Sequence, residues 1–485
     1  MTSGDRSRHP VDRVVRRPRQ RQLEPVRVLT HPRPSIVLSA SAYALLSLTL
    51  GFALLISLGT VALMLPPASV EPGAAPFITA LFTATSAVCV TGLVVETTGK
   101  YWSYFGQSII LVLMFVGGLG LMTATMSILV IVGRHVPLNA RLAVRETLAG
   151  TSLASVLKVS RYILLFAVVT QAMGFGALFI TFMAIYPRDL AAWSALFHSV
   201  SAFNNAGFDI FTESSSLVAY HDYYPLVIII GILIALGGLS FPVLAELWRV
   251  RRVSRWTLDT RLVIHGSLFL WALGILVVLI FEWNNSITLG GMTLPGKLIN
   301  AWFQSVTART AGFSTIDFSA TSAGNDFVFL LLMFIGGASG STAAGIKVNT
   351  IMVLVVAGLS SIQGRQRAEY GSRRLAYAQV IRAIAVTLLA LVALLVFVAA
   401  LLVTESAYLE AGRFDFLDVL FEVVSGFNTV GLSRGITSDL TDPGKLVITT
   451  AMYVGRLGPL TIATGLALRE RRLVYGFPEE SVRIG

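Results

Sequence analysis

The sequence predicts an all-α membrane protein that crosses the bilayer many times. Of its 485 residues, 55% are hydrophobic and only 13% are charged, and the mean hydropathy is +0.75. Runs of about 18 or more residues with almost no charge recur along the chain, and runs of this length are typical of membrane-spanning helices. The runs are continuous instead of alternating, which argues against a transmembrane β-barrel. The composition therefore excludes a soluble enzyme.

Few residues are suited to metal or redox chemistry. The one cysteine, Cys89, cannot form an intrachain disulfide, and no Cys/His cluster suggests a structural metal. None of the six histidines is paired at metal-ligand spacing. We therefore expect no enzyme activity and no organic cofactor in this chain.

The positive charge of the chain, which sums to +11, is concentrated in five groups. They lie in residues 6–33, 134–161, 249–261, 365–382 and 469–483 and hold 28 of the 37 basic residues. Every second connection between the predicted helices carries such a group, and so do both termini. Because basic loops stay on the cytoplasmic side, this pattern predicts an even number of spans in the cell membrane with both termini in the cytoplasm. The charge is thus explained by topology, and we expect no nucleic-acid partner.

Between the basic groups lie four blocks, each with two apolar helices joined by a semi-polar, aromatic segment. The joining segments are too long for a tight turn and too short and mixed for another span, so each is expected to enter the membrane and return. The predicted helix pairs are 37–65 with 103–133, 157–186 with 223–248, 262–283 with 326–358, and 377–404 with 444–468. This gives eight transmembrane helices and four re-entrant pore loops around a central pore. The repeat units are 36–148, 149–258, 259–370 and 371–485, after a basic tail at 1–35.

The basic tail is rich in arginine and has no apolar periodicity. We expect a disordered cytoplasmic arm that rests on anionic lipid. A cleaved signal peptide fits less well, because the apolar stretch that follows is long enough to span and lacks a clear cleavage site.

The four joining segments are copies of one motif. Each has a phenylalanine, a small and hydroxylated stretch, and a glycine between small or apolar residues: FTATSAVCVTGL, FHSVSAFNNAGF, FQSVTARTAGF and FEVVSGFNTVGL. The phenylalanine and the glycine are ten residues apart in three copies and nine in the third. The third copy is therefore one residue short, or aligns on Trp302 instead of Phe303. The simplest arrangement places the four copies around one axis.

The repeated glycines predict a filter for a monovalent cation. Irregular backbone at membrane depth must be buried in protein or line a watery cavity, so four re-entrant loops favour a shared central pathway. A glycine permits backbone angles that point successive carbonyls toward the axis, where their oxygens can replace the hydration shell of the ion. The residues expected to coordinate through their backbone are Val90, Thr91, Gly92 and Leu93; Asn205, Ala206, Gly207 and Phe208; Thr310, Ala311, Gly312 and Phe313; Thr429, Val430, Gly431 and Leu432.

The alternative for these glycines is helix packing, since glycine is common in membrane helices and the chain has 42. One loop alone would favour packing, whereas four loops in register between paired helices favour a filter. Outside the cytoplasmic segments the chain holds 16 acidic against 9 basic residues, an excess that draws cations to a pore mouth. For any individual acid, solvation of an outer loop is an equally good interpretation.

An interrupted helix below the filter predicts a gate. The second helix of the third block contains GGASGSTAAGIK, where glycine and serine weaken the helix and a lysine brings charge into the span. Such a break can act as a movable barrier, and the alternative is a kink or a packing crevice. The residues assigned to the gate are Gly336, Gly337, Ser339, Gly340, Ser341, Gly345, Lys347 and Arg456.

Three arginines lie at membrane depth or beside the filter. A charge at mid-span costs about 2.5 to 3.5 kcal/mol on insertion scales, so Arg456 should face water or an interior partner. It either forms a barrier to cations in the pore, or it pairs with carbonyls of the broken helix or lies close to the cytoplasmic end. Arg309 and Arg434, beside the third and fourth filter segments, are expected to brace the loops by pairing with outer acids such as Asp317 or Glu422.

The four loops, the break GASGSTAAGIK, the arginine in GRLGPLT and the ending FPEESVRIG together resemble the Trk/Ktr/HKT family of potassium uptake proteins. The resemblance extends from Ser35 to Gly485 and is greatest to the membrane subunit of the Ktr branch. It implies potassium uptake, often sodium-dependent, by a homodimer in membrane lipid. It also implies control by a cytosolic nucleotide-binding ring of the RCK type, KtrA-like. The roles it implies within this chain are a filter at Gly92, Gly207, Gly312 and Gly431, a gate from Gly336 to Lys347, and a pore barrier at Arg456.

Two other functions compete with ion uptake. Residues 337–340 match the GxSG element of rhomboid intramembrane proteases, but that chemistry needs a later histidine to activate the serine, and the last histidine here is His265. A secondary transporter for another cation or a small solute, built on broken mid-membrane helices, is the alternative that stays open. Fourfold rather than twofold repetition argues against it.

Overall fold

The computed structural model describes residues 40–120, 156–212, 216–365 and 367–457, which all belong to one compact unit. Within these residues the regular structure is helical apart from one short antiparallel hairpin of β1 (Glu369–Tyr370) and β2 (Arg373–Arg374). The predicted all-α fold is confirmed. The basic tail, the basic residues at 134–145 and the group at 469–483 lie outside the described residues.

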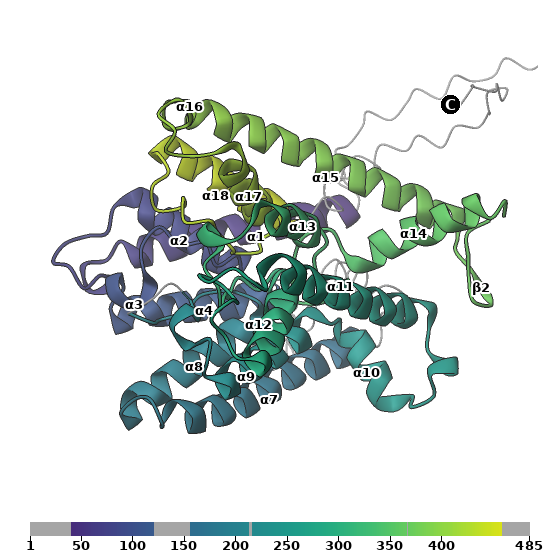
Figure 1. Cartoon of the computed structure of the whole chain (residues 1–485), viewed down its shortest axis with the longest axis horizontal. Coiled ribbons are helices and arrows are strands. Elements are labelled where there is room, and N and C mark those ends of the chain that lie inside the picture. The colour runs from purple at the N-terminus through teal and green to yellow at the C-terminus, as the bar shows by residue number, and fades with distance from the viewer. Residues whose placement is uncertain (1–39, 121–155, 213–215, 366, 458–485) are drawn as a thin grey trace, which may run out of the picture. The chain divides into compact units, whose positions relative to one another are not determined.

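The helices form four successive sets with one plan: a first helix, an inner helix and a second helix (Figure 1). Set one has α1 (Ala40–Leu63), η1 (Pro66–Ala68), α2 (Phe77–Cys89), α3 (Thr98–Tyr101) and α4 (Tyr104–Leu119). Set two has α7 (Val156–Phe182), α8 (Arg188–Asn204), η3 (Val218–Tyr220), α9 (Tyr224–Gly238), α10 (Phe241–Arg249) and η4 (Val253–Arg255). Set three has α11 (Leu258–Glu282), α12 (Leu294–Thr307), η5 (Phe318–Ala320), α13 (Ala323–Phe334) and α14 (Val348–Ile362). Set four has α15 (Tyr377–Thr404), α16 (Ser406–Glu410), α17 (Phe416–Phe427) and α18 (Asp442–Leu457).

The inner helices α2, α8, α12 and α17 begin at clear sequence signals. Pro76 and Pro187 directly precede α2 and α8, and α12 carries a proline in its first turn behind the N-cap Thr293. Helix α17 starts with a capping box between Asp415 and Asp418. The motif phenylalanine of each inner helix is fully buried, at Phe82, Phe197, Phe303 and Phe421. The repeated motif therefore forms the centre of the core.

Contacts between the sets close into a ring. The second helix of each set packs against the inner helix of the next set: α4 against α8, α9 against α12, α13 against α17, and α18 against α2 of the first set. The order returns to its start, so the four copies surround one axis, as the repeat predicted. The inner helices are covered on the outside by the first helices α1, α7, α11 and α15.

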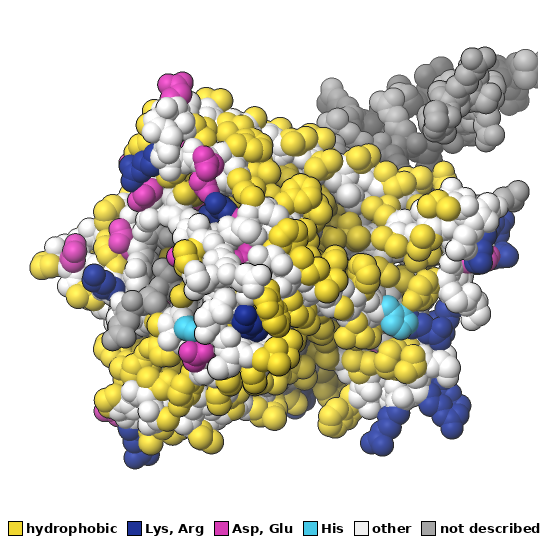
Figure 2. Space-filling view, in the orientation of Figure 1, with side chains coloured by type: hydrophobic (Ala, Val, Ile, Leu, Met, Phe, Trp, Pro, Cys, Tyr) yellow, Lys and Arg dark blue, Asp and Glu magenta, His cyan; other side chains and the backbone are white. Residues whose placement is uncertain are grey.

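The outer surface is that of a membrane protein. Among the described residues, three helical stretches are long and apolar enough to cross a membrane alone, namely 161–182 in α7, α11 and α15, and α9 with α10 would make a fourth as a bent pair. Helix α15 exposes large apolar side chains such as Leu395 (59%) and Val403 (75%). Figure 2 shows hydrophobic side chains over most of the visible surface, while Lys and Arg gather at the end that carries β2 and α10. Lipid is the solvent that suits this surface.

One predicted helix boundary is wrong. The sequence indicated a single helix over 223–248, but the chain breaks after Gly238 and α10 leaves at an angle of 99° to α9. Two glycines precede the break, and Ser240 caps the new helix at the nitrogen of Val243 (3.3 Å) with a proline in its first turn. Apolar content alone could not reveal this break, because α10 continues the hydrophobic run.

Candidate functional site

The four predicted filter segments follow directly from the inner helices and lie together at the centre of the ring. In each segment the first residue and the glycine two positions later have left-handed backbone angles. The φ values are 59° at Val90 and 93° at Gly92, and the same pattern recurs at Asn205 and Gly207, Thr310 and Gly312, and Thr429 and Gly431. A side chain at positive φ is uncommon, and four such positions in register indicate a constrained backbone of functional interest.

The four glycines face one another across a narrow centre. A methyl group added to Gly92 would lie 2.7 Å from the carbonyl oxygen of Ala206, the residue before the next glycine. The same relation holds from Gly207 to Ala311 (2.8 Å), from Gly312 to Val430 (2.9 Å), and from Gly431 back to Thr91. Each segment thus presents the carbonyl before its glycine to the preceding segment. No side chain fits at these four positions without moving backbone.

A hydroxyl group near the end of each inner helix holds its filter segment. The hydroxyl oxygens of Ser86 and Ser425 accept the N–H of Gly92 and Gly431, both at 3.1 Å. The hydroxyls of Ser201 and Thr307 donate to the carbonyl oxygens of Phe208 and Phe313, both at 2.6 Å. These bonds satisfy backbone groups that no helix or sheet pairs.

The hydroxyl bonds also settle the alignment of the third copy. In every copy the hydroxyl follows the buried phenylalanine by four residues, but it precedes the glycine by six residues in three copies and by five in the third. The third copy therefore aligns on Phe303 and not on Trp302. Its missing residue lies between Thr307 and Gly312.

A cavity of about 540 Å³ lies against one side of the glycine ring, and all four filter glycines line it. Its described lining residues include the acids Glu96, Asp209 and Asp317 but no lysine or arginine. A concave wall with only negative charge raises the local concentration of cations. We refer to this cavity as the vestibule.

Asp209 is the acid of the vestibule wall that follows a filter segment most closely. It is half-buried, and its carboxylate accepts the N–H of Phe211 at 3.2 Å. Burial raises the pKa of the Asp209 carboxyl to about 7, although backbone hydrogen bonds from Phe211 and Ser216 oppose the shift. The charge of the vestibule therefore changes near neutral pH.

The predicted break in the third block is confirmed as a loop between α13 and α14. This loop (336–347), which we call the gate loop after its predicted role, closes on itself through bonds from Gly336 N to Ile346 O (2.9 Å) and from Val348 N to Gly337 O (3.0 Å). It is also bonded to the end of α9: Ala338 N and Thr342 N donate to the carbonyl oxygens of Gly238 and Gly237 at 3.1 and 3.2 Å. The loop is thus bonded to a neighbouring set and is not a simple kink.

Two cations within the span find backbone carbonyls as partners. Arg456 donates to the carbonyl oxygens of Thr342 in the gate loop (2.8 Å) and Gly117 in α4 (2.6 Å). These contacts are the ones expected if Arg456 pairs with carbonyls of the broken helix, and its role as a pore barrier stays a prediction. Lys347 donates to Ala343 O at 2.6 Å. In the described part of the chain, neither cation forms an ion pair with a carboxylate.

Arg434 pairs with acids, as expected, although not with Asp317 or Glu422, whereas the expected acidic partner of Arg309 is wrong. Arg309 donates to the carbonyl oxygen of Gly336 in the gate loop at 3.2 Å and lies over the ring of Trp271. Arg434 pairs instead with Asp418 at 2.6 Å and with the fully buried Asp326. Asp317 caps its own turn, and Glu422 accepts hydroxyl groups from Ser433 and Thr437.

Sequence reasoning missed a second repeated glycine. Gly117, Gly237 and Gly455 of the second helices lie so close to the carbonyl oxygens of Val88, Phe203 and Phe427 that no Cβ could be accommodated. These carbonyls come two residues before the three filter segments. The sequence did contain a signal for this second glycine. It is a pair of adjacent glycines in three sets, Gly117–Gly118, Gly237–Gly238 and Gly336–Gly337, and Gly455 followed by Arg456 in the fourth. Arg456 occupies the position of the second glycine in the fourth set.

Comparisons with known proteins agree on one family. The family profile TrkH, described as cation transport protein, matches residues 45–471. The chain is 37% identical over 438 residues to Ktr system potassium uptake protein B of Bacillus subtilis, which covers 90% of this chain and 96% of that protein. It is 38% identical over 437 residues to potassium/sodium uptake protein NtpJ of Enterococcus hirae, with the same coverage. The crystal structure of the potassium transporter TrkH from Vibrio parahaemolyticus superposes with a TM-score of 0.68 over 90% of this chain and 86% of that one. At 20% identity it shows a shared fold.

The pair formed by Arg434 and Asp326 predicts a stability effect, because it joins the fourth filter loop to α13 of the third set. Arg434→Gln leaves a fully buried carboxylate without its partner, which should cost about 3 to 5 kcal/mol and lower the thermal midpoint in detergent. The matched control is Arg413→Gln, whose bond to Asp439 is half-exposed and worth about 1 kcal/mol or less. Equal shifts for the two variants would contradict the structural role of Arg434.

Proposed function

The chain belongs to the TrkH family of cation transport proteins, and we propose that it takes up potassium through the centre of its four filter segments. The observation that carries this proposal is the closed order of the four glycines, each facing the carbonyl before the next. The names of two relatives, a potassium uptake protein and a potassium/sodium uptake protein, support the choice of ion.

The path of the ion begins in the vestibule. Glu96, Asp209 and Asp317 attract cations, and the ion then reaches the glycine ring without meeting a lysine or arginine among the described lining residues. In the ring, backbone carbonyls replace the water of the ion. The carboxyl-terminal ends of the four inner helices lead into the filter segments, and their partial negative charge favours a cation there.

The gate loop controls the exit from the filter. It contacts the end of the fourth inner helix, since a Cβ on Gly345 would lie 3.3 Å from the amide oxygen of Asn428. Arg456 holds the loop at Thr342 and adds a positive charge that opposes the passage of cations. Movement of the loop away from these partners would open the path.

The assembly is proposed on the resemblance to the Ktr branch. We infer a homodimer in the cell membrane, with a cytosolic nucleotide-binding ring of the RCK type as regulatory partner. Sodium-dependent uptake is part of the same proposal. Because basic loops stay on the cytoplasmic side, we place the basic surface near β2 and α10 toward the cytoplasm.

Serine substitution tests the filter. Changing Gly92, Gly207, Gly312 or Gly431 to Ser adds a side chain at positive φ against the next carbonyl, so potassium uptake should fall at least about tenfold. The measurement is growth rescue of a bacterium without potassium uptake, together with potassium and sodium flux in liposomes. Gly412→Ser is the control, because Gly412 has a φ of 67° with nothing within 4 Å. Equal rescue by wild type and all four variants would reject the filter.

Shortening the gate loop tests the gate. Deletion of residues 338–344 removes the bonds to α9 and Arg456, so potassium flux in liposomes should rise severalfold over that of the intact chain. Ser341→Ala is the control, since it removes only a bond within the loop, from Ser341 to Ala338 O. Flux equal to wild type after the deletion would count against a gate.

The vestibule predicts a dependence on external pH. Asp209 is neutral below its pKa of about 7 and charged above it, so uptake at low potassium should be roughly two- to threefold faster at external pH 8 than at pH 6. Asp209→Asn should flatten this profile. Asp222→Asn, at an exposed acid outside the vestibule, should leave it unchanged. A profile that keeps its slope in Asp209→Asn would remove Asp209 from the entry path.

A further inference from the structure

The residues directly before the second and the fourth filter segments face the second helix or the gate loop of the preceding set. Asn204 packs against Gly118 of α4, and Asn428 contacts Gly345 of the gate loop. This position therefore connects the filter to the part of the molecule that surrounds the exit of the pore.

In the third set this position holds Arg309, which is 5% exposed. The one hydrogen bond that its guanidinium makes to a described residue goes from a terminal nitrogen to Gly336 O, at the first residue of the gate loop (3.2 Å). No described carboxylate pairs with the guanidinium, and its Nε has no partner there. A buried charge held by so few groups is costly, and a further polar contact would stabilise it.

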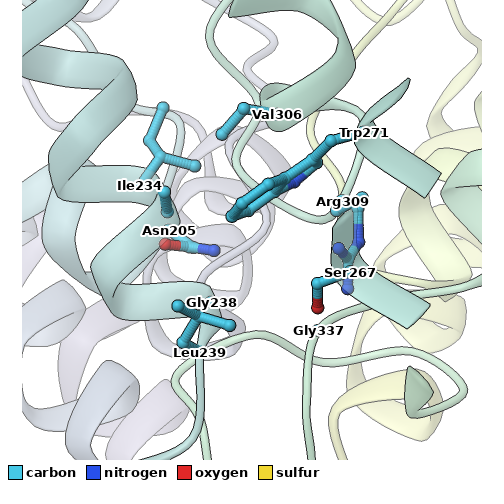
Figure 3. Close-up of a pocket in the computed structure, with 10 residues that line it drawn as sticks. Asn205, Ile234, Gly238, Leu239, Ser267, Trp271, Val306, Arg309 and Gly337 are labelled. Carbon is cyan, nitrogen blue, oxygen red and sulfur yellow. The ribbon is translucent and has the colours of Figure 1, made fainter. Parts of the chain in front are cut away.

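A small cavity lies beside this arginine, between sets two and three (Figure 3). Arg309, Asn205 and Ser267 supply its polar lining, and Trp271, Gly238 and Gly337 are among the other lining residues. The Ser267 hydroxyl is buried without a partner among the described residues, like the Arg309 Nε. Asn205 is the first residue of the second filter segment, and one end of its amide points into the cavity.

The size of the cavity selects its ligand. Its volume is about 10 Å³, close to the space that a single water needs, and two to four polar groups are what a buried water requires. A water there can accept the N–H of Arg309 Nε, exchange a hydrogen bond with Ser267 Oγ and contact the Asn205 amide. It would complete the bonding of two buried polar atoms at once.

We propose that Arg309 is a positioning residue that joins two filter segments to the gate loop, through its bond to Gly336 and through one water held with Ser267. This inference rests on the proposed function, because it assigns the link between filter and gate in the same pathway. The third filter segment is joined to the gate loop through the backbone of Arg309, which directly precedes it. The second filter segment is joined to the gate loop through the water that contacts Asn205. Release of Gly336 therefore loosens the loop, and loss of the water alters ion selection in the filter.

The experiment uses the full chain in lipid nanodiscs and in liposomes. Hydrogen exchange of the amides in residues 336–347 reports on the loop, and the ratio of potassium to sodium flux reports on the filter. Arg309→Met removes both links, so loop exchange should be about tenfold faster and the flux ratio should fall severalfold. Arg309→Lys retains a charged donor for Gly336 but lacks Nε, so loop exchange stays near wild type while the flux ratio falls. Ser267→Ala should behave as Arg309→Lys does.

Lys297→Met is the matched control. Lys297 also lies over a tryptophan ring and donates to a backbone carbonyl, but at an exposed site outside the cavity. It should change neither readout. If Arg309→Met folds and leaves loop exchange and flux ratio unchanged, Arg309 is not a positioning residue. If Arg309→Lys and Ser267→Ala both keep the wild-type flux ratio, the water link is wrong, and this outcome does not depend on whether Arg309→Met folds.

Two further outcomes separate the parts of the proposal. An anomalous bromide signal in the cavity, in a structure determined with bromide, would replace the water by an anion and overturn that assignment. If the wild type carries no potassium, the proposed function fails. Loop exchange in Arg309→Met still decides whether the arginine holds Gly336.

Discussion

The need to satisfy irregular backbone at membrane depth governs this structure. Four segments leave their helices in left-handed conformations, and lipid offers nothing for their amides and carbonyls. They can exist only where protein surrounds them, so the four sets close into a ring with the segments at its centre. A hydroxyl from each inner helix bonds the segment that follows it. The carbonyls that precede the four glycines therefore lie close to the neighbouring segments around the centre of the ring.

The same constraint explains how charge is distributed. At the outer ends of the helices, Arg434 has carboxylate partners, and the vestibule wall is acidic. Inside the span, Arg456, Lys347 and Arg309 have carbonyl partners instead. A carbonyl holds an arginine in place without cancelling its charge, so these cations still act on an ion nearby. The gate loop supplies three of the accepting carbonyls, which makes it the element that the buried charges hold.

Much of this was predictable because the molecule repeats itself. The four blocks, the four repeated segments and the broken helix follow from periodicity and glycine spacing, and the structure has four helix sets, four segments with the same backbone angles and a loop between α13 and α14. The break between α9 and α10 was not predictable from the sequence, because Phe241 and Pro242 continue an apolar run across it. The sequence showed that the third copy of the motif is one residue short. Only the hydrogen bond of Thr307 in the structure showed that the missing residue lies after Phe303. The partners of Arg434 could not be chosen from sequence, because Asp326 lies in another set and many acids were available.

The central claim is that main-chain oxygens of four equivalent segments hold the transported ion. The most direct measurement is a structure of the full chain determined with rubidium or thallium in place of potassium, using anomalous scattering to locate the ion. The account predicts density on the common axis, level with Gly92, Gly207, Gly312 and Gly431 and bounded by the carbonyls that precede them. Density found only beside the acidic side chains of the vestibule, with the ring unoccupied at saturating ion, would contradict it.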